Sequence, residues 1–325
     1  MTSTALPVQA ASEATTRRTT PRGAGFEPVF EMLCFSAATC LLAALGGVLV
    51  SLTIGGWPAL AHFGPGFLTS SQWDPVADVY GAAGPIVGTL ITSALALLIA
   101  LPVAGGVAFF LVELCPVFLR RPIGTAVELL AGIPSIVYGM WGLFVFAPFF
   151  SRHVQLPLMS AAPPGSIWEQ LTQGVPNGSG IMSAGVILAI MILPFMAATL
   201  RELLLTVPPQ VRESAYGLGA TTSEVVMKVT LPYVRRGAIG AVMLGLGRAL
   251  GETMAVTFII GNAHGFPKSL FDSGSTIAST IANEFAEAAP GLHSASLVAL
   301  GLVLFLITFA VLAIARLMLR TQARL

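Results

Sequence analysis

Six apolar runs alternate with polar connections along this chain. Each approaches or exceeds the roughly 20 residues that an α-helix needs to cross a bilayer. They cover about residues 29–54, 85–112, 123–150, 180–205, 237–261 and 293–319. Several hold Pro or Gly, which membrane helices tolerate because neighbouring groups satisfy the freed backbone. The pattern predicts an all-α membrane protein with six transmembrane helices.

Composition agrees with this class. Of 325 residues, 55 % are hydrophobic and 10 % are charged, and the net charge of +1 gives no indication of nucleic-acid binding. Residues 1–27 lack the apolar core of a cleavable signal peptide and predict a disordered tail. Residues 321–325 form a second short tail, and residues 28–320 are then one transmembrane domain in the lipid bilayer.

Basic residues are distributed unequally between the two sides of the predicted bundle. With six spans, 13 of the 16 Lys and Arg residues fall on the side that holds both termini. Only Arg152 and Lys268 fall on the other side, and Arg248 lies inside the fifth span. Lys and Arg are enriched in the cytoplasmic loops of membrane proteins. The asymmetry therefore predicts a multi-pass protein with both termini in the cytoplasm.

The longest cytoplasmic connection, residues 206–236, is rich in charges. Two prolines suit the first turn of a short helix there, and Gly219 closes that helix. Thr221 and Glu224 fit a capping box that starts a second helix, which Pro232 ends. The order predicts a helix–turn–helix at the cytoplasmic surface. An ordinary amphipathic linker with snorkelling charges is the alternative.

The spacing in this segment resembles the EAA loop of ABC importer permeases. That pattern reads Glu-Ala-Ala, three residues, Gly, nine residues, Ile, one residue, Leu-Pro; here Ser214 replaces the second position and Val229 replaces Ile. In that family the loop docks into a cleft of a cytoplasmic ATPase. The resemblance implies that the ATPase-coupling residues are Glu213, Ser214, Ala215, Gly219, Ala220, Leu231 and Pro232.

The chain carries no sequence signature of an ATPase. No Gly-x-x-x-x-Gly-Lys-Ser/Thr phosphate loop occurs, and neither of the two lysines, Lys228 and Lys268, follows such a loop. We therefore expect a transport subunit that is not itself an enzyme, with no catalytic residue and no cofactor. If transport is driven by ATP, the ATPase is another chain.

Cysteines and histidines predict no metal site. The three cysteines lie in or beside apolar runs without metal-ligand spacing, and we expect them to pack as small hydrophobic residues. The four histidines, in or beside the outward connections, are His62, His153, His264 and His293. A metal centre needs clustered ligands. These residues are scattered along the chain, so we expect solvated or interfacial histidines.

The fifth apolar run carries two charges, in the sequence GLGRALGETMAV. Arg248 and Glu252 are four residues apart and would share one face of a continuous helix. A charge at the bilayer centre costs about 2.5–3.5 kcal/mol, so such residues usually face a bundle interior or a watery path. Arg248 would offer a fork of donors to an oxyanion, with Glu252 holding that fork in place. A self-neutralising pair that only aids packing is the alternative.

The stretch VELLAGIPSIVYGMWG in the third run is a weaker candidate. Gly132 and Pro134 would open a local kink, beside which Ser135 and Tyr138 would line the translocation path. Ordinary packing of a kinked membrane helix explains the same residues equally well, because Pro and Gly are frequent in such helices.

Four stretches together resemble the PstC-type phosphate permeases of bacterial inner membranes: FGPGFLTSSQWDP, ELLAGIPSIVYG, ESAYGLGATTSEVVMKVTLP and GLGRALGETMAVT. The resemblance implies the type I ABC importer permease fold and phosphate as substrate, with Arg248 and Glu252 matching a charged pair tied to phosphate passage. It implies three protein partners: a PstA-type permease, a PstB-type ATPase dimer and a periplasmic PstS-type phosphate-binding protein. Two alternatives stay open, namely a permease for sulfate, molybdate or another oxyanion, and an ATP-independent secondary carrier or channel.

Overall fold

The computed structural model describes residues 27–321. The predicted tails lie outside these residues, except for Glu27 and Thr321, which are helical. The chain divides into two compact units, Met1–Val50 and Ser51–Leu325. The described part of the first unit is the beginning of helix α1 (Glu27–Phe63), whose residues are almost all exposed. The elements below belong to the second unit.

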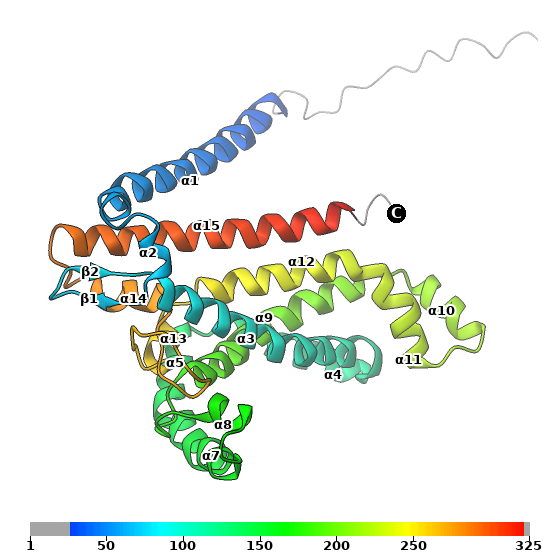
Figure 1. Cartoon of the computed structure of the whole chain (residues 1–325). Helices are drawn as coiled ribbons and strands as arrows, with labels where there is room; N and C mark the ends of the chain where they lie inside the picture. Colours follow the sequence, from blue (N-terminus) through cyan, green and yellow to red (C-terminus); the bar gives the residue numbers. More distant parts are fainter. Residues whose placement is uncertain (1–26, 322–325) are drawn as a thin grey trace, which may run out of the picture. The chain divides into compact units, whose positions relative to one another are not determined.

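This second unit is built almost entirely of helices (Figure 1). The longer ones are α3 (Ala83–Phe109), α4 (Val117–Ala131), α9 (Ile181–Leu205), α12 (Leu231–Leu250) and α15 (Leu292–Thr321). The shorter ones are α2 (Gly66–Thr69), α5 (Ser135–Trp141), α6 (Ala147–Phe150), α7 (Leu156–Ala161), α8 (Ile167–Thr172), α10 (Pro209–Gly217), α11 (Thr222–Glu224), α13 (Met254–Ile259) and α14 (Ile277–Glu284). Stretches of π-helix join several of them: η1 (Phe110–Leu114), η2 (Gly142–Phe146), η3 (Ser151–Gln155) and η4 (Val225–Thr230).

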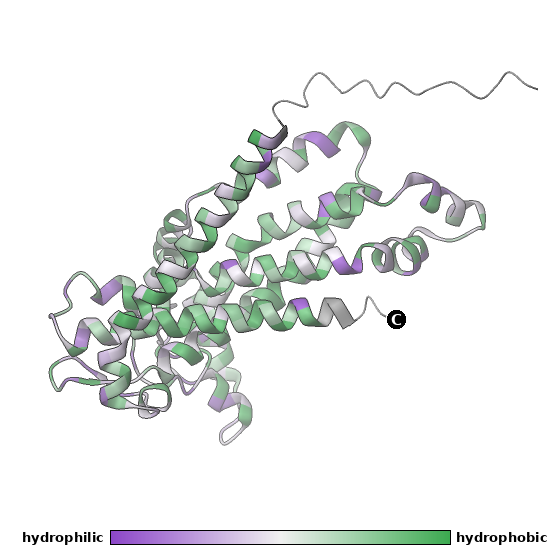
Figure 2. Ribbon diagram, turned by 90° about the horizontal axis from the view of Figure 1, so that it is seen from above, coloured by the Kyte–Doolittle hydropathy of each residue, from purple (hydrophilic) through white to green (hydrophobic). Residues whose placement is uncertain are grey.

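Helices of membrane-spanning length occur where the apolar pattern predicts them. Within the described residues, four helices are long and apolar enough to cross a membrane: Pro28–Phe63, Ala83–Leu114, Ile181–Leu205 and Leu292–Leu317. The pair Val117–Ala131 and Ser135–Ala161, bent by 86°, is a fifth if it forms one span. Figure 2 shows that the long helices are hydrophobic along most of their length. The protein is therefore a mostly helical membrane protein.

The predicted helix over residues 237–261 is interrupted. Helix α12 stops at Leu250 and α13 starts at Met254, with Gly251 as the residue that caps the end of α12. Glycine favours helix ends because its backbone freedom makes a continuous helix less stable. The prediction of one continuous helix is wrong here, and the break falls between the two charged candidates.

Small residues allow the central helices to approach closely. Helix α9 packs against α3, α4 and α12. Ala96, Ala100 and Ala104 of α3 are fully buried, and a Cβ added at Gly185 of α9 would lie 2.9 Å from the Cβ of Leu95. Membrane helices commonly associate through such small residues, because lipid gives no hydrophobic driving force between them. Close packing at small residues therefore determines how the central helices of this unit associate.

A β-hairpin in the connection between α2 and α3 departs from the predicted all-α class. Strands β1 (Trp73–Asp74) and β2 (Val79–Tyr80) pair antiparallel, with Trp73 opposite Tyr80. Asp74 stabilises the turn, because its carboxylate accepts hydrogen bonds from the N–H groups of Val76 and Ala77. Trp73 and Tyr80 are buried in a second apolar cluster that includes residues of α14 and α15.

Substitution of one buried alanine tests the fit between α3 and α9. We expect Ala100→Leu to lower the stability of the isolated chain in detergent by about 1–3 kcal/mol, because added methylenes in a packed core force neighbours out of place. Ala94→Leu is the matched control on the same helix, since Ala94 is exposed. Thermal unfolding measures both. Equal stability of the two variants would contradict the packing described here.

Candidate functional site

The predicted coupling segment forms a helical hairpin beyond the ends of α9 and α12 (Figure 1). Helix α10 leads into a turn in which Gly219 has a φ of +88°, the left-handed region that glycine adopts without strain. The N–H of Gly219 donates to the carbonyl of Tyr216, and the N–H of Ala220 donates to that of Ala215. The predicted glycine turn is confirmed.

The second half of the hairpin begins with the predicted capping box. The Thr221 hydroxyl accepts a hydrogen bond from the Glu224 N–H, and the Glu224 carboxylate accepts one from the Thr221 N–H. The Lys228 ammonium lies 3.0 Å from Glu224. Its hydrogen bond, followed by those from Thr221, lowers the pKa of Glu224 to about 2. The carboxylate that starts this helix is therefore ionised at neutral pH.

Pro232 does not end the second helix, which corrects the sequence prediction. Helix α11 continues through η4 into α12, so residues 222–250 follow one helical path. Proline in a helix clashes with the carbonyl four residues earlier. In η4 the N–H of Leu231 donates instead to the carbonyl of Val226, five residues back. This wider turn lies directly before the proline and lets the chain continue as a helix.

Candidate coupling residues lie on both the surface and the interior of the hairpin. The exposed ones are Glu213, Ser214, Gly219 and Pro232, the half-buried ones are Ala220 and Leu231, and Ala215 is buried. Beside Gly219, the side chain of Leu218 is 90 % exposed. A Cβ added at Gly219 would have no atom of the described structure within 4 Å. The turn thus presents a small apolar surface that no described residue covers.

Arg248 lies in the last turn of α12 and is half-buried. Its guanidinium carbon sits 5.6 Å from the centre of the Phe195 ring of α9, a cation–π contact. Helices α12 and α9 therefore meet at this cation.

Glu252 does not pair with Arg248 in the part of the chain that the structure describes. The two residues do not share a helix face, because α12 ends between them. The Glu252 carboxylate instead accepts a hydrogen bond of 3.1 Å from the N–H of Ala255, in the first turn of α13. The expected role in holding the arginine fork is thus replaced by capping of a short helix. Glycine is typical of helix ends and acidic residues of helix starts. The dipeptide Gly251-Glu252 therefore indicates that one helix ends here and another begins.

The predicted kink in the third apolar run is a complete break. Helix α4 ends at Ala131, and Ser135 is the first residue of α5. The Tyr138 hydroxyl donates a hydrogen bond of 3.0 Å to the carbonyl of Leu130, which also accepts one of 3.3 Å from the N–H of Ile133. A Cβ added at Gly139 would lie 3.0 Å from Ala255, so α5 and α13 pack closely. The two broken runs therefore meet where α5 packs on α13.

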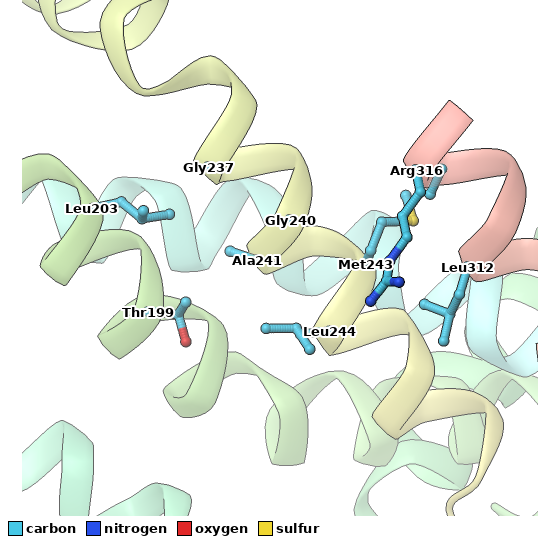
Figure 3. A pocket seen from close by; sticks show the side chains of 10 residues that line it. Thr199, Leu203, Gly237, Gly240, Ala241, Met243, Leu244, Leu312 and Arg316 are labelled. Carbon is cyan, nitrogen blue, oxygen red and sulfur yellow. The ribbon is translucent and has the colours of Figure 1, made fainter. Parts of the chain in front are cut away.

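A cavity of about 410 Å³ opens between α9, α12 and α15, separately from the residues above (Figure 3). Gly237, Gly240 and Leu244 of α12 form one wall, and the Arg316 side chain extends from α15 toward that helix. None of the candidate path residues lines this cavity.

Two histidines that lie apart in the sequence contact the same carboxylate. His264 Nε2 lies 3.1 Å from one oxygen of Glu284, and His293 Nε2 lies 2.9 Å from the other. Trp73 Nε1 donates a third hydrogen bond to Glu284 at 2.8 Å. The rings also stack, Trp73 on His264 and Tyr80 on His293. We call these five residues the Glu284 clasp; it joins the β-hairpin, α14 and α15.

Ionisation of Glu284 maintains the clasp. Burial raises the pKa of this carboxyl, but hydrogen bonds from His264, His293 and Trp73 outweigh burial and hold it below its ordinary value. Of the histidines expected to be solvated or interfacial, His264 and His293 are half-buried partners of this carboxylate. Among the described residues, no group of His, Cys, Asp and Glu has the arrangement of a metal site.

Comparison with known protein families shows to which family this chain belongs. Residues 110–323 match the family described as binding-protein-dependent transport system inner membrane component. The chain belongs to this family. As a member, it is a multi-pass permease subunit of an ABC importer in the inner membrane, and it is not the ATPase. The family also implies an ATPase and a substrate-binding protein as partners.

Individual relatives of this family member are similar over nearly its whole length. It is 54 % identical to the phosphate transport system permease protein PstC of Mesorhizobium japonicum, over 98 % of this chain and 97 % of that one. It is 56 % identical to the protein of the same name from Pasteurella multocida, over 84 % and 85 %. A chain from the crystal structure of a bacterial alginate ABC transporter aligns with a TM-score of 0.57 at 18 % identity, over 92 % of this chain and 97 % of that one, and supports the fold.

Because of the Glu284 clasp, the stability of the chain should vary with pH in the acid range. A carboxyl whose pKa is lowered by folding stabilises the folded state above its unfolded pKa, here 4.5, and this contribution is lost as pH falls through the folded value. We expect the melting temperature of the wild type to exceed that of Glu284→Gln at pH 4.5. The difference should shrink as the pH is lowered further. A difference that stays constant through this acid range would contradict the pairing.

Proposed function

We propose that this chain is the permease subunit of an ATP-driven importer that carries inorganic phosphate across the bacterial inner membrane. The observation that carries the proposal is the 54 % identity, over 98 % of the chain, to a protein named as a phosphate transport permease. Residues 28–320 cross the membrane in six spans, and both termini lie in the cytoplasm. The 13-to-2 distribution of basic residues supports this orientation.

Its partners are a second, homologous PstA-type permease, a PstB-type ATPase dimer below the membrane and a PstS-type phosphate-binding protein outside it. The absence of a phosphate loop from the sequence supports a separate ATPase. The exposed apolar turn at Leu218 and Gly219, in the coupling segment 206–236, supports docking of this segment into that ATPase. ATP binding then moves the segment and switches the path between outward and inward access.

Phosphate passes the region where the two broken runs meet. Arg248 supplies the positive charge, because a guanidinium offers several N–H donors in a planar fork to a tetrahedral oxyanion. Glu252 shapes the break through its hydrogen bond to Ala255, and Ser135 and Tyr138 flank the same region on α5. Irregular backbone inside a membrane occurs where it lines a cavity or is covered by protein, which supports a path at these breaks.

Uptake by cells tests the proposal directly. A strain that lacks this chain should lose high-affinity uptake of radiolabelled phosphate and recover it when the chain is supplied. An excess of sulfate or molybdate should not compete. Uptake of sulfate or molybdate in place of phosphate would contradict the substrate, and full uptake after loss of the ATPase subunit would indicate a secondary carrier.

The role of Arg248 is tested by Arg248→Gln. We expect phosphate uptake to fall by about ten- to a hundredfold, because a hydrogen bond to a charged group contributes about 1.5–3 kcal/mol. The amount of assembled complex, measured by co-purification with the ATPase, should stay at the wild-type level. If this variant takes up phosphate at the wild-type rate, Arg248 serves only in packing and the proposed role is contradicted.

Docking of the coupling segment is tested by a pair of aspartate substitutions. Gly219→Asp should leave membrane insertion intact and lower uptake by about tenfold or more, since an unpaired charge buried at an interface costs on the order of 2 kcal/mol or more. Gly217→Asp is the matched control, because Gly217 ends α10 without a positive φ and is also exposed. ATP hydrolysis should continue in both variants. Normal uptake by Gly219→Asp would contradict docking at the turn.

A further inference from the structure

A nearly buried ion pair joins the coupling segment to the end of α3. Arg212 of α10 lies with Nη1 3.0 Å from Oε1 of Glu113 in η1. The Arg212 side chain is 18 % exposed and the Glu113 side chain 10 %. Arg212 Nη2 also donates to the carbonyl of Val207, at 3.3 Å. The Arg212 guanidinium thus connects α10 both to the segment that follows α9 and to the π-helix that follows α3.

Two other groups of ion pairs in the described structure are more open. Arg201 contacts Glu128 and Glu202, whose side chains are 52 % and 65 % exposed, and Lys228 and Glu224 are 73 % and 44 % exposed. Exposed pairs contribute little, whereas removal of one partner from a buried pair leaves an uncompensated charge. The Arg212–Glu113 pair is therefore a stronger fixed electrostatic connection of the coupling segment than the Lys228–Glu224 pair.

Apolar packing also joins the coupling segment to this region, because Val207 and Val112 are buried in one cluster. A cavity of about 450 Å³ lies beside Glu113, and its walls come from the end of α3 and η1 on one side and from α11 and η4 on the other. Thr222, Ser223 and Met227 form the second wall. Next to the pair, empty space thus separates the second half of the hairpin from the end of α3, and the pair gives the first half a polar connection to η1.

Helix α3 extends from this pair to the other end of the unit. It packs along α9 and α12. Near its start, a Cβ added at Gly88 would lie 2.0 Å from the carbonyl oxygen of Ser275, and the Thr89 hydroxyl accepts a hydrogen bond of 2.9 Å from the N–H of Ile277. A displacement of the end of α3 therefore reaches the segment that leads into α14, through rigid and closely packed contacts.

We propose that Arg212 and Glu113 are positioning residues that transmit movement of α10 to α3, and through α3 to the outward end of the permease. This inference rests on the proposed function, in which an ATPase moves the coupling segment. A pair that transmits movement has to keep α10 and α3 together while both shift. A charge-assisted contact beside this cavity fulfils this requirement, because it connects α10 to the end of α3 without filling the space there.

The ratio of phosphate transported to ATP hydrolysed tests the proposal. The complete complex is reconstituted in liposomes with the binding protein and radiolabelled inorganic phosphate outside. We expect Arg212→Gln and Glu113→Gln each to lower this ratio by about tenfold, within the range typical of coupling between two sites. The exchanged double variant, Arg212→Glu with Glu113→Arg, should restore the ratio in part. Arg201→Gln is the control and should leave the ratio unchanged.

A merely structural pair gives a different result. Loss of the pair would then reduce the amount of assembled complex while each remaining complex keeps the wild-type ratio, and this outcome overturns the inference. Failure of the exchanged variant to restore a lowered ratio overturns it as well. Failure of the proposed function is distinguishable, because the wild-type complex itself would then show no ATP-dependent phosphate uptake.

Discussion

Backbone groups freed where a helix breaks inside a membrane must find partners within the protein, and the described structure depends on this constraint. Two apolar runs are broken, and at each break a side chain forms a hydrogen bond with a backbone group. The Tyr138 hydroxyl bonds the carbonyl of Leu130, and the Glu252 carboxylate bonds the N–H of Ala255. Close packing of α5 on α13 at Gly139 then holds the two breaks together. The same arrangement leaves Arg248 at the junction of α12 and α9 without a carboxylate partner among the described residues.

This junction is connected to the proposed site of energy input by continuous structure. The path from Thr222 through η4 to Leu250 is helical throughout, so the coupling hairpin and Arg248 belong to one element. Helix α3 gives a second route, because Arg212 binds its end at Glu113. The capping box at Thr221 and the left-handed Gly219 fix the hairpin itself. A helix transmits displacement along its axis well, since each turn is held by backbone hydrogen bonds. The architecture therefore suits a permease that is driven by a separate ATPase.

Local signals in the sequence predicted much of this. The apolar runs indicated the long helices, Thr221 and Glu224 the capping box, and Gly219 the turn, because each depends on residues close in sequence. Predictions failed where one residue admits two interpretations. Glu252 was expected to hold the Arg248 fork, although its carboxylate caps a helix, and Pro232 was expected to stop a helix that a wider turn continues. The Glu284 clasp and the Arg212–Glu113 pair join segments far apart in sequence, the latter 99 residues apart, so no local pattern contains them.

Reconstituted transport is the most direct measurement of the central claim, that this permease moves phosphate with energy supplied by another chain. The purified complex is placed in liposomes with ATP inside, and the binding protein and radiolabelled phosphate are added outside. The account predicts phosphate accumulation that needs both ATP and the binding protein and that does not follow an imposed ion gradient. Accumulation without ATP, driven by such a gradient, would contradict it.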